Sequence, residues 1–286
     1  MRIIALANQK GGVGKTTSAI NLAAALVERR RRILLVDFDP QASATTALGI
    51  DPEALDASVN HVLRAVMNDA SSPALADIIL STPAGIDLVP ADISLSATEA
   101  DLLMAMGGES VLREALVSSD IAVSPMSDHA HERDARARPS PLPYDYILID
   151  CLPSLGLLAI NALTAADEVL VPVQAEYLPM KGLRLLVQTV AKVRARLNPR
   201  LQVAGILLTM VESRTLHSQE VVAHVRSIFE GKVRVFDTMI KRTVRLREAA
   251  VVGESILTYA PRHDAAEAYR ALARELEGGS PALDRR

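Results

Sequence analysis

The sequence has very few cysteine and aromatic residues. Among its 286 residues there is one cysteine, Cys151, no tryptophan, and an aromatic content of only 3%. A single thiol excludes an internal disulfide bond, and chains poor in cysteine are typical of a reducing compartment. We therefore expect a cytoplasmic protein.

Long apolar runs are also missing. The chain contains no uninterrupted apolar stretch of about 18 residues, which a membrane-spanning helix requires. The first residues lead directly into an apolar strand pattern, so we expect no N-terminal signal. A hydrophobic content of 49% with 23% charged residues is typical of a globular protein, and the length suits one large α/β domain or two small ones.

Positive charge is unevenly distributed along the chain. The formal net charge is −3, yet residues 181–262 contain 15 lysine and arginine residues against 6 acidic ones. This local excess of +9 leaves −12 on the remainder of the chain. A polyanion is therefore an expected partner for this basic region.

Apolar runs of strand length alternate with helical patterns along most of the chain. This alternation predicts an α/β fold with a mostly parallel twisted sheet, helices on both faces, and ligands at the carboxyl ends of the strands. We expect one domain over residues 1–278, interrupted by a flexible insertion at 118–143 and followed by a disordered tail at 279–286. The expected strands are 3–7, 33–37, 86–90, 146–150, 168–173, 203–210 and 233–236, and the expected helices are 16–29, 97–116, 155–163, 181–197, 218–229 and 265–277.

Residues 8–17, NQKGGVGKTT, lie where the first strand pattern gives way to the first helical pattern. Glycines at such a turn let backbone N–H groups converge on phosphate oxygens, and the helix presents its positive end to the same anion. Lys15 is expected to reach the β- and γ-phosphates, and the Thr16 hydroxyl to ligate Mg²⁺. The residues expected to bind the nucleotide here are Lys10, Gly11, Gly12, Val13, Gly14, Lys15, Thr16 and Thr17.

Three aspartates end predicted strands. Asp39 follows the second strand and is expected to orient the attacking water or hold the water shell of the metal ion, whereas Asp37 could do the same or simply cap a nearby turn. Asp150 closes the fourth strand, where a carboxylate of the Walker-B kind fixes Mg²⁺. Cys151 could be a nucleophile, but no histidine is suitably placed in the sequence, so we expect a buried small side chain.

The glycine-rich segment departs from the strict pattern G-x-x-x-x-G-K-[ST], because Gln9 replaces its first glycine; it matches K-G-G-x-G-K-T-T instead. It resembles the deviant Walker-A ATPases of the ParA/MinD family. The resemblance implies that Lys10 reaches across a nucleotide-sandwich dimer to the partner's phosphates. It also implies that residues 37–41, DFDPQ, are the first switch, in which hydrolysis depends on Asp39, although Ala42 and Ser43 replace the usual Gly-Asn.

Further motifs extend the resemblance over nearly the whole chain, apart from 118–143 and the tail. Residues 151–156, CLPSLG, resemble the second switch, and residues 172–177, PVQAEY, and 244–249, VRLREA, are similar to segments of chromosomal ParA proteins of the Soj type. Residues 205–215 resemble the strand and loop that contact the nucleotide base, which implies that Thr209 and Met210 do so here.

The resemblance implies an ATP-dependent switch for chromosome or plasmid partitioning, associated with the nucleoid. In this family the ATP-bound homodimer binds double-stranded DNA non-specifically, and a ParB-type partner stimulates slow hydrolysis and release. Lys10, Lys15 and Asp39 are then the catalytic residues, and Thr16, Asp39 and Asp150 the Mg²⁺ site. The candidate DNA contacts are Lys181, Arg184, Lys192, Arg194, Arg196, Arg214, Arg242, Arg245 and Arg247.

The alternative is a MinD-like membrane-associated ATPase. Such a protein needs a C-terminal amphipathic helix with a basic face and bulky apolar residues, whereas residues 264–277 are rich in alanine and acidic. We therefore expect no membrane partner. A reductase like the nitrogenase iron protein is excluded, because its shared cluster needs two cysteines from each subunit.

Overall fold

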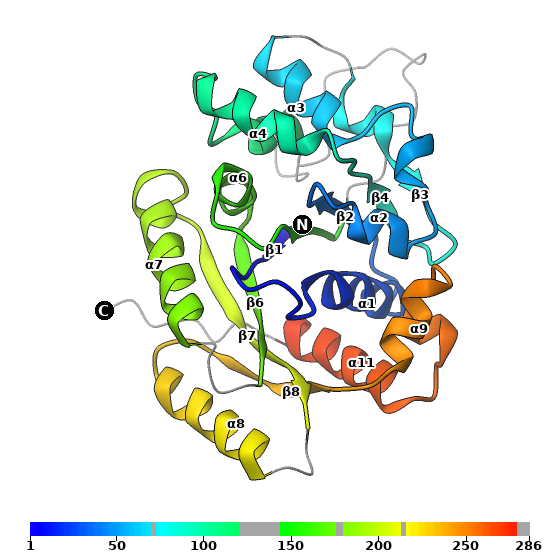
Figure 1. The fold of residues 1–286 in the computed structure, drawn as a ribbon, viewed down its shortest axis with the longest axis vertical. Coiled ribbons are helices and arrows are strands. Elements are labelled where there is room, and N and C mark those ends of the chain that lie inside the picture. Colours follow the sequence, from blue (N-terminus) through cyan, green and yellow to red (C-terminus); the bar gives the residue numbers. More distant parts are fainter. Residues whose placement is uncertain (70–72, 120–143, 176–179, 213–215, 279–286) are drawn as a thin grey trace, which may run out of the picture.

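The computed structural model describes residues 1–69, 73–119, 144–175, 180–212 and 216–278. These residues form one eight-stranded sheet in the order β3-β4-β2-β5-β1-β6-β7-β8, covered by helices on both faces (Figure 1). All neighbouring strands are parallel except β3, which pairs antiparallel with β4. The strands are β1 (Arg2–Leu6), β2 (Ile33–Phe38), β3 (Leu80–Ser81), β4 (Asp87–Val89), β5 (Tyr146–Cys151), β6 (Glu168–Gln174), β7 (Gln202–Val211) and β8 (Val235–Lys241).

The central strands are apolar along their whole length because both faces of the sheet are covered. Every residue of β2 and β5 is buried, and alternate side chains enter two separate hydrophobic clusters. The helices are α1 (Lys15–Glu28), α2 (Ser43–Ala47), α3 (Val59–Met67), α4 (Leu95–Met104), α5 (Val111–Ser118), α6 (Leu157–Ala165), α7 (Met180–Arg196), α8 (Leu216–Phe229), α9 (Arg245–Val251), α10 (Ile256–Tyr259) and α11 (Asp264–Glu277), with 3-10 turns at Pro52–Ala54 and Leu75–Ile78.

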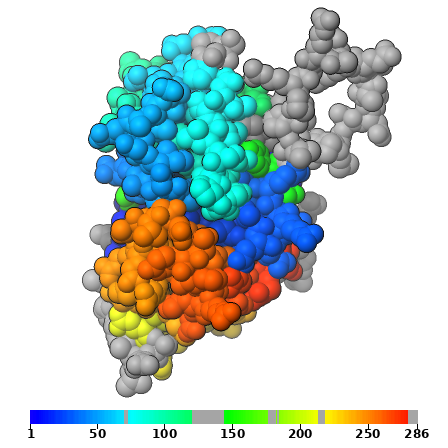
Figure 2. Space-filling view, turned by 90° about the vertical axis from the view of Figure 1, so that its right-hand side faces the viewer, coloured from blue at the N-terminus to red at the C-terminus, as the bar shows by residue number. Residues whose placement is uncertain are grey.

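The two clusters lie on opposite faces of the sheet. One contains side chains of α3, α5, α6, α7 and α8, and the other those of α1, α9, α10 and α11. Helices α1 and α11 pack side by side on the second face (Figure 1). The segment near residue 250, orange in Figure 2, also lies beside the segment near residue 50, and a Cβ atom on Gly253 would lie 3.1 Å from the Cα atom of Gly49. The polypeptide after α2 is therefore in backbone contact with the C-terminal helices.

The expected helix 97–116 is wrong as a single element, because Gly107 and Gly108 divide it into α4 and α5. Gly107 has a φ of +68°, and a Cβ atom on Gly108 would lie 2.0 Å from the carbonyl oxygen of Leu102. The last expected strand is longer and lies later than predicted, as β8. The expected insertion overlaps Ser118 of α5, but most of it and all of the expected tail lie outside the described residues.

Candidate functional site

The loop between β1 and α1 contains two glycines in the left-handed region. Gly12 has a φ of +70°, and Gly14, at the start of α1, has a φ of +83°. Side chains with a Cβ atom are strained in this conformation, so glycine at these two positions follows from the path of the backbone. The loop ends at the N-terminus of a 14-residue helix, which is a suitable site for a phosphate group.

Lys15 is the first residue of α1, directly after this loop. Its side chain is buried, at 6% exposure, and its Nζ atom donates a hydrogen bond of 3.2 Å to the carbonyl oxygen of Lys10. Burial lowers the pKa of Lys15, and the nearby Asp150 carboxylate opposes this shift. An ammonium group held over the loop is well placed to bind phosphate oxygens.

Lys10 is exposed, unlike Lys15. Its Nζ atom donates a hydrogen bond of 3.1 Å to Oε1 of Gln174, at the end of β6, while its backbone N–H donates to Oδ1 of Asn8. The two lysines therefore differ in environment: the Lys15 side chain is buried at the start of α1, and the exposed Lys10 side chain is bound to the end of β6.

Asp37 and Asp39 are both buried but have different partners. Asp37 accepts hydrogen bonds of 2.8 Å from both the backbone N–H and the hydroxyl of Thr45, so the turn-capping alternative describes its contacts. Burial raises the pKa of Asp37 to about 6, although the hydrogen bonds from Thr45 oppose this. Asp39 accepts a hydrogen bond of 2.9 Å from the backbone N–H of Gln41.

Asp150 is fully buried and lies opposite Asp37 in the register of β5 and β2. Neither of its carboxylate oxygens accepts a hydrogen bond from any residue that the structure describes. Burial raises the pKa of Asp150 well above its usual value, and the nearby Asp37 raises it further. Thr16 and Lys15 are close enough to oppose this shift. Because a buried carboxylate with so little hydrogen bonding is unfavourable, this position suits a divalent cation that would offset the charge.

A magnesium ion at this position would share its ligands between the protein and the nucleotide. In the described part of the chain, no three histidine, cysteine, aspartate or glutamate side chains form a group that could hold a metal ion. Mg²⁺ is usually bound by one or two carboxylates together with substrate phosphates and water. Asp150 and Thr16, which lies in the first turn of α1, fit that kind of shared site.

Thr209 and Met210 lie near the end of β7, beside the phosphate-binding loop. The Thr209 hydroxyl donates a hydrogen bond of 2.9 Å to the carbonyl oxygen of Val13, and Met210 has a φ of +52°, an uncommon value for a residue with a side chain. Next to them is a cavity of about 220 Å³. Its lining includes Gly14, Thr17, Thr209, Met210, Arg242 and Arg247. This cavity adjoins the loop where a nucleotide base would lie.

Cys151 is buried, and burial raises the pKa of its thiol. Its Sγ atom donates a weak hydrogen bond of 3.7 Å to the carbonyl oxygen of Ile149, and the side chain packs in a hydrophobic cluster. It therefore behaves as the buried small side chain that the sequence predicts.

The candidate DNA contacts fall into two groups. Arg184, Lys192, Arg194 and Arg196 are exposed on α7 and form no ion pair within the described ranges. By contrast, the Arg242 side chain is paired with Glu212 at 3.0 Å, and that of Arg245 with Glu248 at 2.8 Å. Arg242 and Arg247 also line the cavity beside the phosphate loop. Arg214 and the side chain of Lys181 lie outside the described part.

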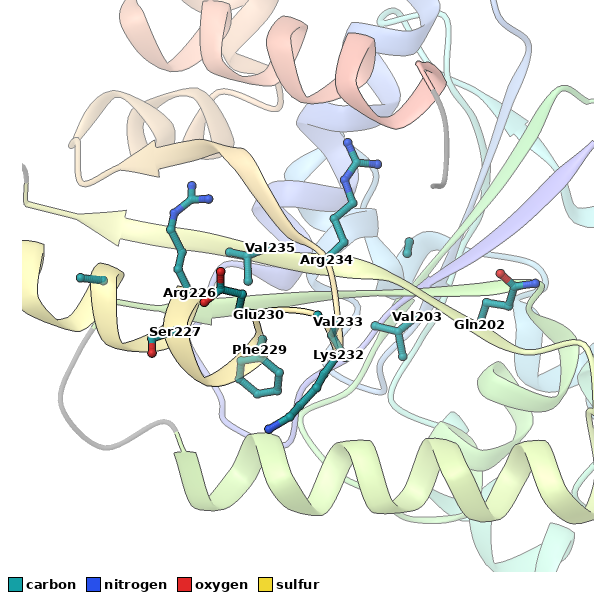
Figure 3. Close-up of a pocket in the computed structure, with 13 residues that line it drawn as sticks. Gln202, Val203, Arg226, Ser227, Phe229, Glu230, Lys232, Val233, Arg234 and Val235 are labelled. Atoms are coloured by element: carbon teal, nitrogen blue, oxygen red, sulfur yellow. The ribbon is translucent and has the colours of Figure 1, made fainter. Parts of the chain in front are cut away.

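Sequence reasoning missed a groove between α7 and α8, at the amino ends of β6, β7 and β8. Two adjoining cavities of about 880 and 670 Å³ share Gln202, Val203, Lys232 and Val233 in their linings (Figure 3). Lys232 extends toward α7 in Figure 3, whereas Arg234 points toward α11, where it pairs with Glu275. We call this surface the basic groove, defined by Arg194, Arg200, Arg226 and Lys232. Of these four, Arg226 also forms an ion pair of 3.2 Å with Asp237.

Three acidic residues, Asp167, Glu168 and Glu230, line the basic groove, and the first two are engaged elsewhere. Glu168 forms an ion pair of 2.8 Å with Arg2, and Asp167 accepts a hydrogen bond from the backbone N–H of Ile3. Gln202 is the first residue of β7 and Thr209 lies near its last, so the groove and the phosphate loop are at opposite ends of the same strand. Only the folded chain brings these cations together, because they come from α7, α8 and two connecting segments.

Comparisons with known proteins find relatives that match over most of the chain. A family model described as an AAA domain matches residues 1–121 and 138–203. The sporulation initiation inhibitor protein Soj of Bacillus subtilis is 42% identical over 96% of this chain and 98% of its own length. The chromosome partitioning protein ParA of Caulobacter vibrioides is 40% identical over 96% of this chain and 94% of its own.

Solved structures show the same fold. A Mycobacterium smegmatis structure named cobyrinic acid a,c-diamide synthase, with bound ADP and magnesium, is 36% identical with a TM-score of 0.77, over 98% of this chain and 97% of that one. The cell division ATPase MinD of Pyrococcus furiosus is 26% identical with a TM-score of 0.67, over 97% and 98%. With the glycine-rich loop, the buried Lys15 and the aspartates at the strand ends, these relatives show that the chain belongs to the ParA/MinD family of deviant Walker-A ATPases, close to the Soj type.

Proposed function

We propose that this chain is an ATP- and Mg²⁺-dependent partitioning switch whose ATP-bound dimer binds duplex DNA and releases it after hydrolysis. The observation that carries the proposal is the presence of the phosphate loop and the basic groove at opposite ends of one sheet. One end can bind the nucleotide while the other contacts a polyanion, and neither site obstructs the other.

ATP and Mg²⁺ are the cofactors of the chain. The backbone of residues 11–14 and Lys15 would bind the phosphates, and Thr16 and Asp150 would hold Mg²⁺, which neutralises charge on the phosphates when it is bound. Asp39 would orient the water for hydrolysis, directly or by holding the metal's water shell. Thr17, Thr209 and Met210, which line the cavity beside the loop, would contact the base.

Lys10 would link nucleotide binding to dimerisation. Its side chain is exposed and is held at the surface by Gln174 rather than inside its own phosphate loop. A surface lysine at this position can exchange that amide partner for the phosphates of a second copy. ATP would then add a favourable contact that only the dimer makes.

The basic groove would bind the DNA backbone. Lysine and arginine contacts to phosphates need a cluster of positive charge and carry no sequence information, in keeping with non-specific binding. Aromatic residues are scarce in the chain, so stacking of unpaired bases is not supported and duplex DNA is the better ligand. A ParB-type partner would stimulate the slow hydrolysis that releases the DNA.

A MinD-like membrane function has less support. The apolar side of α11, including Tyr269 and Leu272, is buried against the second hydrophobic cluster and faces α1, so it is not free to enter a membrane. Among the residues that the structure describes, no helix is both long enough and apolar enough to cross a bilayer. No feature of the described site specifically favours a synthase over an ATPase.

The decisive experiment is sedimentation of the protein with non-specific duplex DNA or with anionic liposomes, with ATP, ADP or no nucleotide. We expect the ATP-bound protein to sediment with DNA but not with liposomes. Its affinity for DNA should fall steeply as the salt concentration rises. Arg200→Ala and Lys232→Ala should each lower the magnitude of the salt slope by about 1, while Arg113→Ala on α5 should leave it unchanged. The proposal would be refuted if DNA binding did not depend on the nucleotide or on the salt concentration, or if the protein bound liposomes instead of DNA.

A further inference from the structure

The carboxylate of Asp37 holds both ends of the segment that carries Asp39. Its Oδ1 atom accepts a hydrogen bond of 3.3 Å from the backbone N–H of Asp39. Its Oδ2 atom accepts two hydrogen bonds of 2.8 Å, from the backbone N–H and the hydroxyl of Thr45. We call residues 39–45 the switch turn; one buried side chain joins its first residue to its last.

Thr45 extends this network to a second loop. Its hydroxyl donates to Asp37 and also accepts a hydrogen bond of 3.1 Å from the backbone N–H of Ala91, which follows β4. The next residue, Asp92, is in turn held by the Ser58 hydroxyl at 2.5 Å, at the start of α3. These bonds attach the switch turn to the segment that follows β4 and, through it, to the start of α3.

The interior of the switch turn is also fixed. The backbone N–H of Ala42 donates to the carbonyl oxygen of Asp39 at 2.9 Å. The backbone N–H of Gln41 donates to the Oδ1 atom of Asp39, also at 2.9 Å. With these contacts and the attachment at Asp37, the orientation of the Asp39 side chain depends on a closed set of hydrogen bonds.

Two buried carboxylates lie side by side on β2 and β5, and they differ in the number of hydrogen bonds that they accept. Asp37 accepts three hydrogen bonds, of about four that a carboxylate can accept. Asp150, its neighbour in register, accepts none from the described residues. Both oxygens of Asp150 are therefore open to a metal ion, whereas those of Asp37 accept hydrogen bonds from two backbone N–H groups and the Thr45 hydroxyl.

We propose that Asp37 and Thr45 are positioning residues for hydrolysis, which hold the switch turn so that Asp39 faces the phosphate loop, and that Asp37 does not ligate Mg²⁺. This inference rests on the proposed role of Asp39 in hydrolysis. It assigns the Thr45 hydroxyl a role in the rate of the reaction without contact to the nucleotide or the metal. Loss of this hydroxyl loosens the turn and misplaces Asp39.

The test compares Thr45→Val, Thr45→Ser and a matched control, Thr164→Val. Thr164 is also a buried threonine, but its hydroxyl has no hydrogen-bond partner in the described ranges, and it lies on α6, outside the site. We expect Thr45→Val to lower kcat for ATP hydrolysis about 10- to 100-fold, as misplacement of a reacting group does, with the Kd for ATP and the Mg²⁺ midpoint within twofold of wild type. Thr45→Ser should restore most of the rate, and Thr164→Val should change nothing.

Asp37→Asn and Asp150→Asn separate positioning from metal binding. Asp37→Asn should lower kcat while the Mg²⁺ concentration for half-maximal activity stays unchanged, and Asp150→Asn should raise that concentration at least tenfold. Rates are taken per bound nucleotide, so a partly folded sample does not imitate the effect. If Thr45→Val does not fold, Thr45→Ala removes the same hydroxyl without adding a methyl group.

Two results would overturn the inference. One is a wild-type kcat in Thr45→Val and Thr45→Ala; the other is a Mg²⁺ midpoint in Asp37→Asn shifted as far as that in Asp150→Asn. Asp39→Ala tests the underlying assumption separately. If Asp39→Ala hydrolyses ATP at the wild-type rate, the proposed role of Asp39 is wrong, whatever Thr45→Val does.

Discussion

The hydroxyl of Thr209 donates a hydrogen bond of 2.9 Å to the carbonyl oxygen of Val13, which joins the end of β7 to the phosphate-binding loop. A Cβ atom on Gly14 would lie 4.0 Å from the methyl group of Thr209, so the two segments lie next to each other. Thr209 therefore supports the conformation of the loop, in addition to the base contact that its position in the sequence predicts.

Thr209→Val should weaken nucleotide binding. The substitution keeps the shape of the side chain but leaves the Val13 carbonyl oxygen without this donor, at an expected cost of about 1–3 kcal/mol. We expect a Kd for ATP about 5- to 10-fold higher by calorimetry, and a smaller change in Thr209→Ser, which retains the hydroxyl. Equal affinities for the valine variant and wild type would show that the bond does not support the loop.

Lys10→Ala should separate nucleotide binding from dimerisation. In an Asp39→Ala background, where ATP is expected to persist, we expect dimers by sedimentation velocity, and monomers once Lys10→Ala is added. ATP binding to the monomer should remain within a few-fold, because the ammonium group of Lys15, not that of Lys10, is buried against the loop. Gln9→Ala, an exposed neighbour, is the control and should still dimerise. ATP-dependent dimers of the Lys10→Ala chain would mean that this lysine does not reach a second copy.

The fold and the phosphate loop could be predicted from the sequence because their signals are local. Buried parallel strands are continuous apolar runs, and the glycines of the loop mark left-handed backbone at the following helix. The break between α4 and α5 was missed, because its cause is the close approach of Gly108 to the Leu102 carbonyl oxygen. That distance is a property of the folded turn rather than of the helical pattern.

The basic groove shows the limit of sequence reasoning for the site. The excess of positive charge in residues 181–262 was visible, but the sequence could not distinguish cations that meet in space from those paired with acids. Arg242 belongs to the second kind, paired with Glu212, whereas Arg200 and Lys232 line one cavity despite lying far apart in the chain. The sequence likewise could not decide whether Asp37 binds the metal ion or caps a turn. That choice depends on its hydrogen bond with Thr45, which forms only in the folded turn.

Asp150→Asn should stabilise the nucleotide-free protein, although it should also raise the Mg²⁺ concentration that gives half-maximal activity. Burial raises the pKa of Asp150 well above its usual value and that of Asp37 to about 6, so both retain protons in the folded chain at pH values where the unfolded chain has lost them. Raising the pH through this interval therefore destabilises the folded state. We expect the wild-type free energy of unfolding, measured with urea in EDTA, to fall between pH 5 and 8.

The asparagine variant should show a shallower decline with pH, and at pH 8 its free energy of unfolding should exceed that of wild type by about 1–3 kcal/mol. The difference should be smaller at pH 5, because the raised pKa of Asp150 favours the protonated form more there than at pH 8. A wild-type stability that rises over this range would contradict the assignment of an unpartnered buried carboxylate at this position.

Ala42 and Ala44 should respond differently to glycine, although both are buried alanines of the switch turn. Ala44→Gly removes a buried methyl group and a good helix former, which together cost about 2 kcal/mol. Ala42 has a φ of +51°, where a Cβ atom is unfavourable by about 1–2 kcal/mol, so glycine relieves strain that offsets the lost methyl group. We expect Ala42→Gly to lie within about 1 kcal/mol of wild type in urea unfolding. Because glycine readily adopts the backbone conformation already present there, the variant should also retain full ATP hydrolysis. A loss of stability as large as that of Ala44→Gly would mean that the left-handed turn is absent in solution.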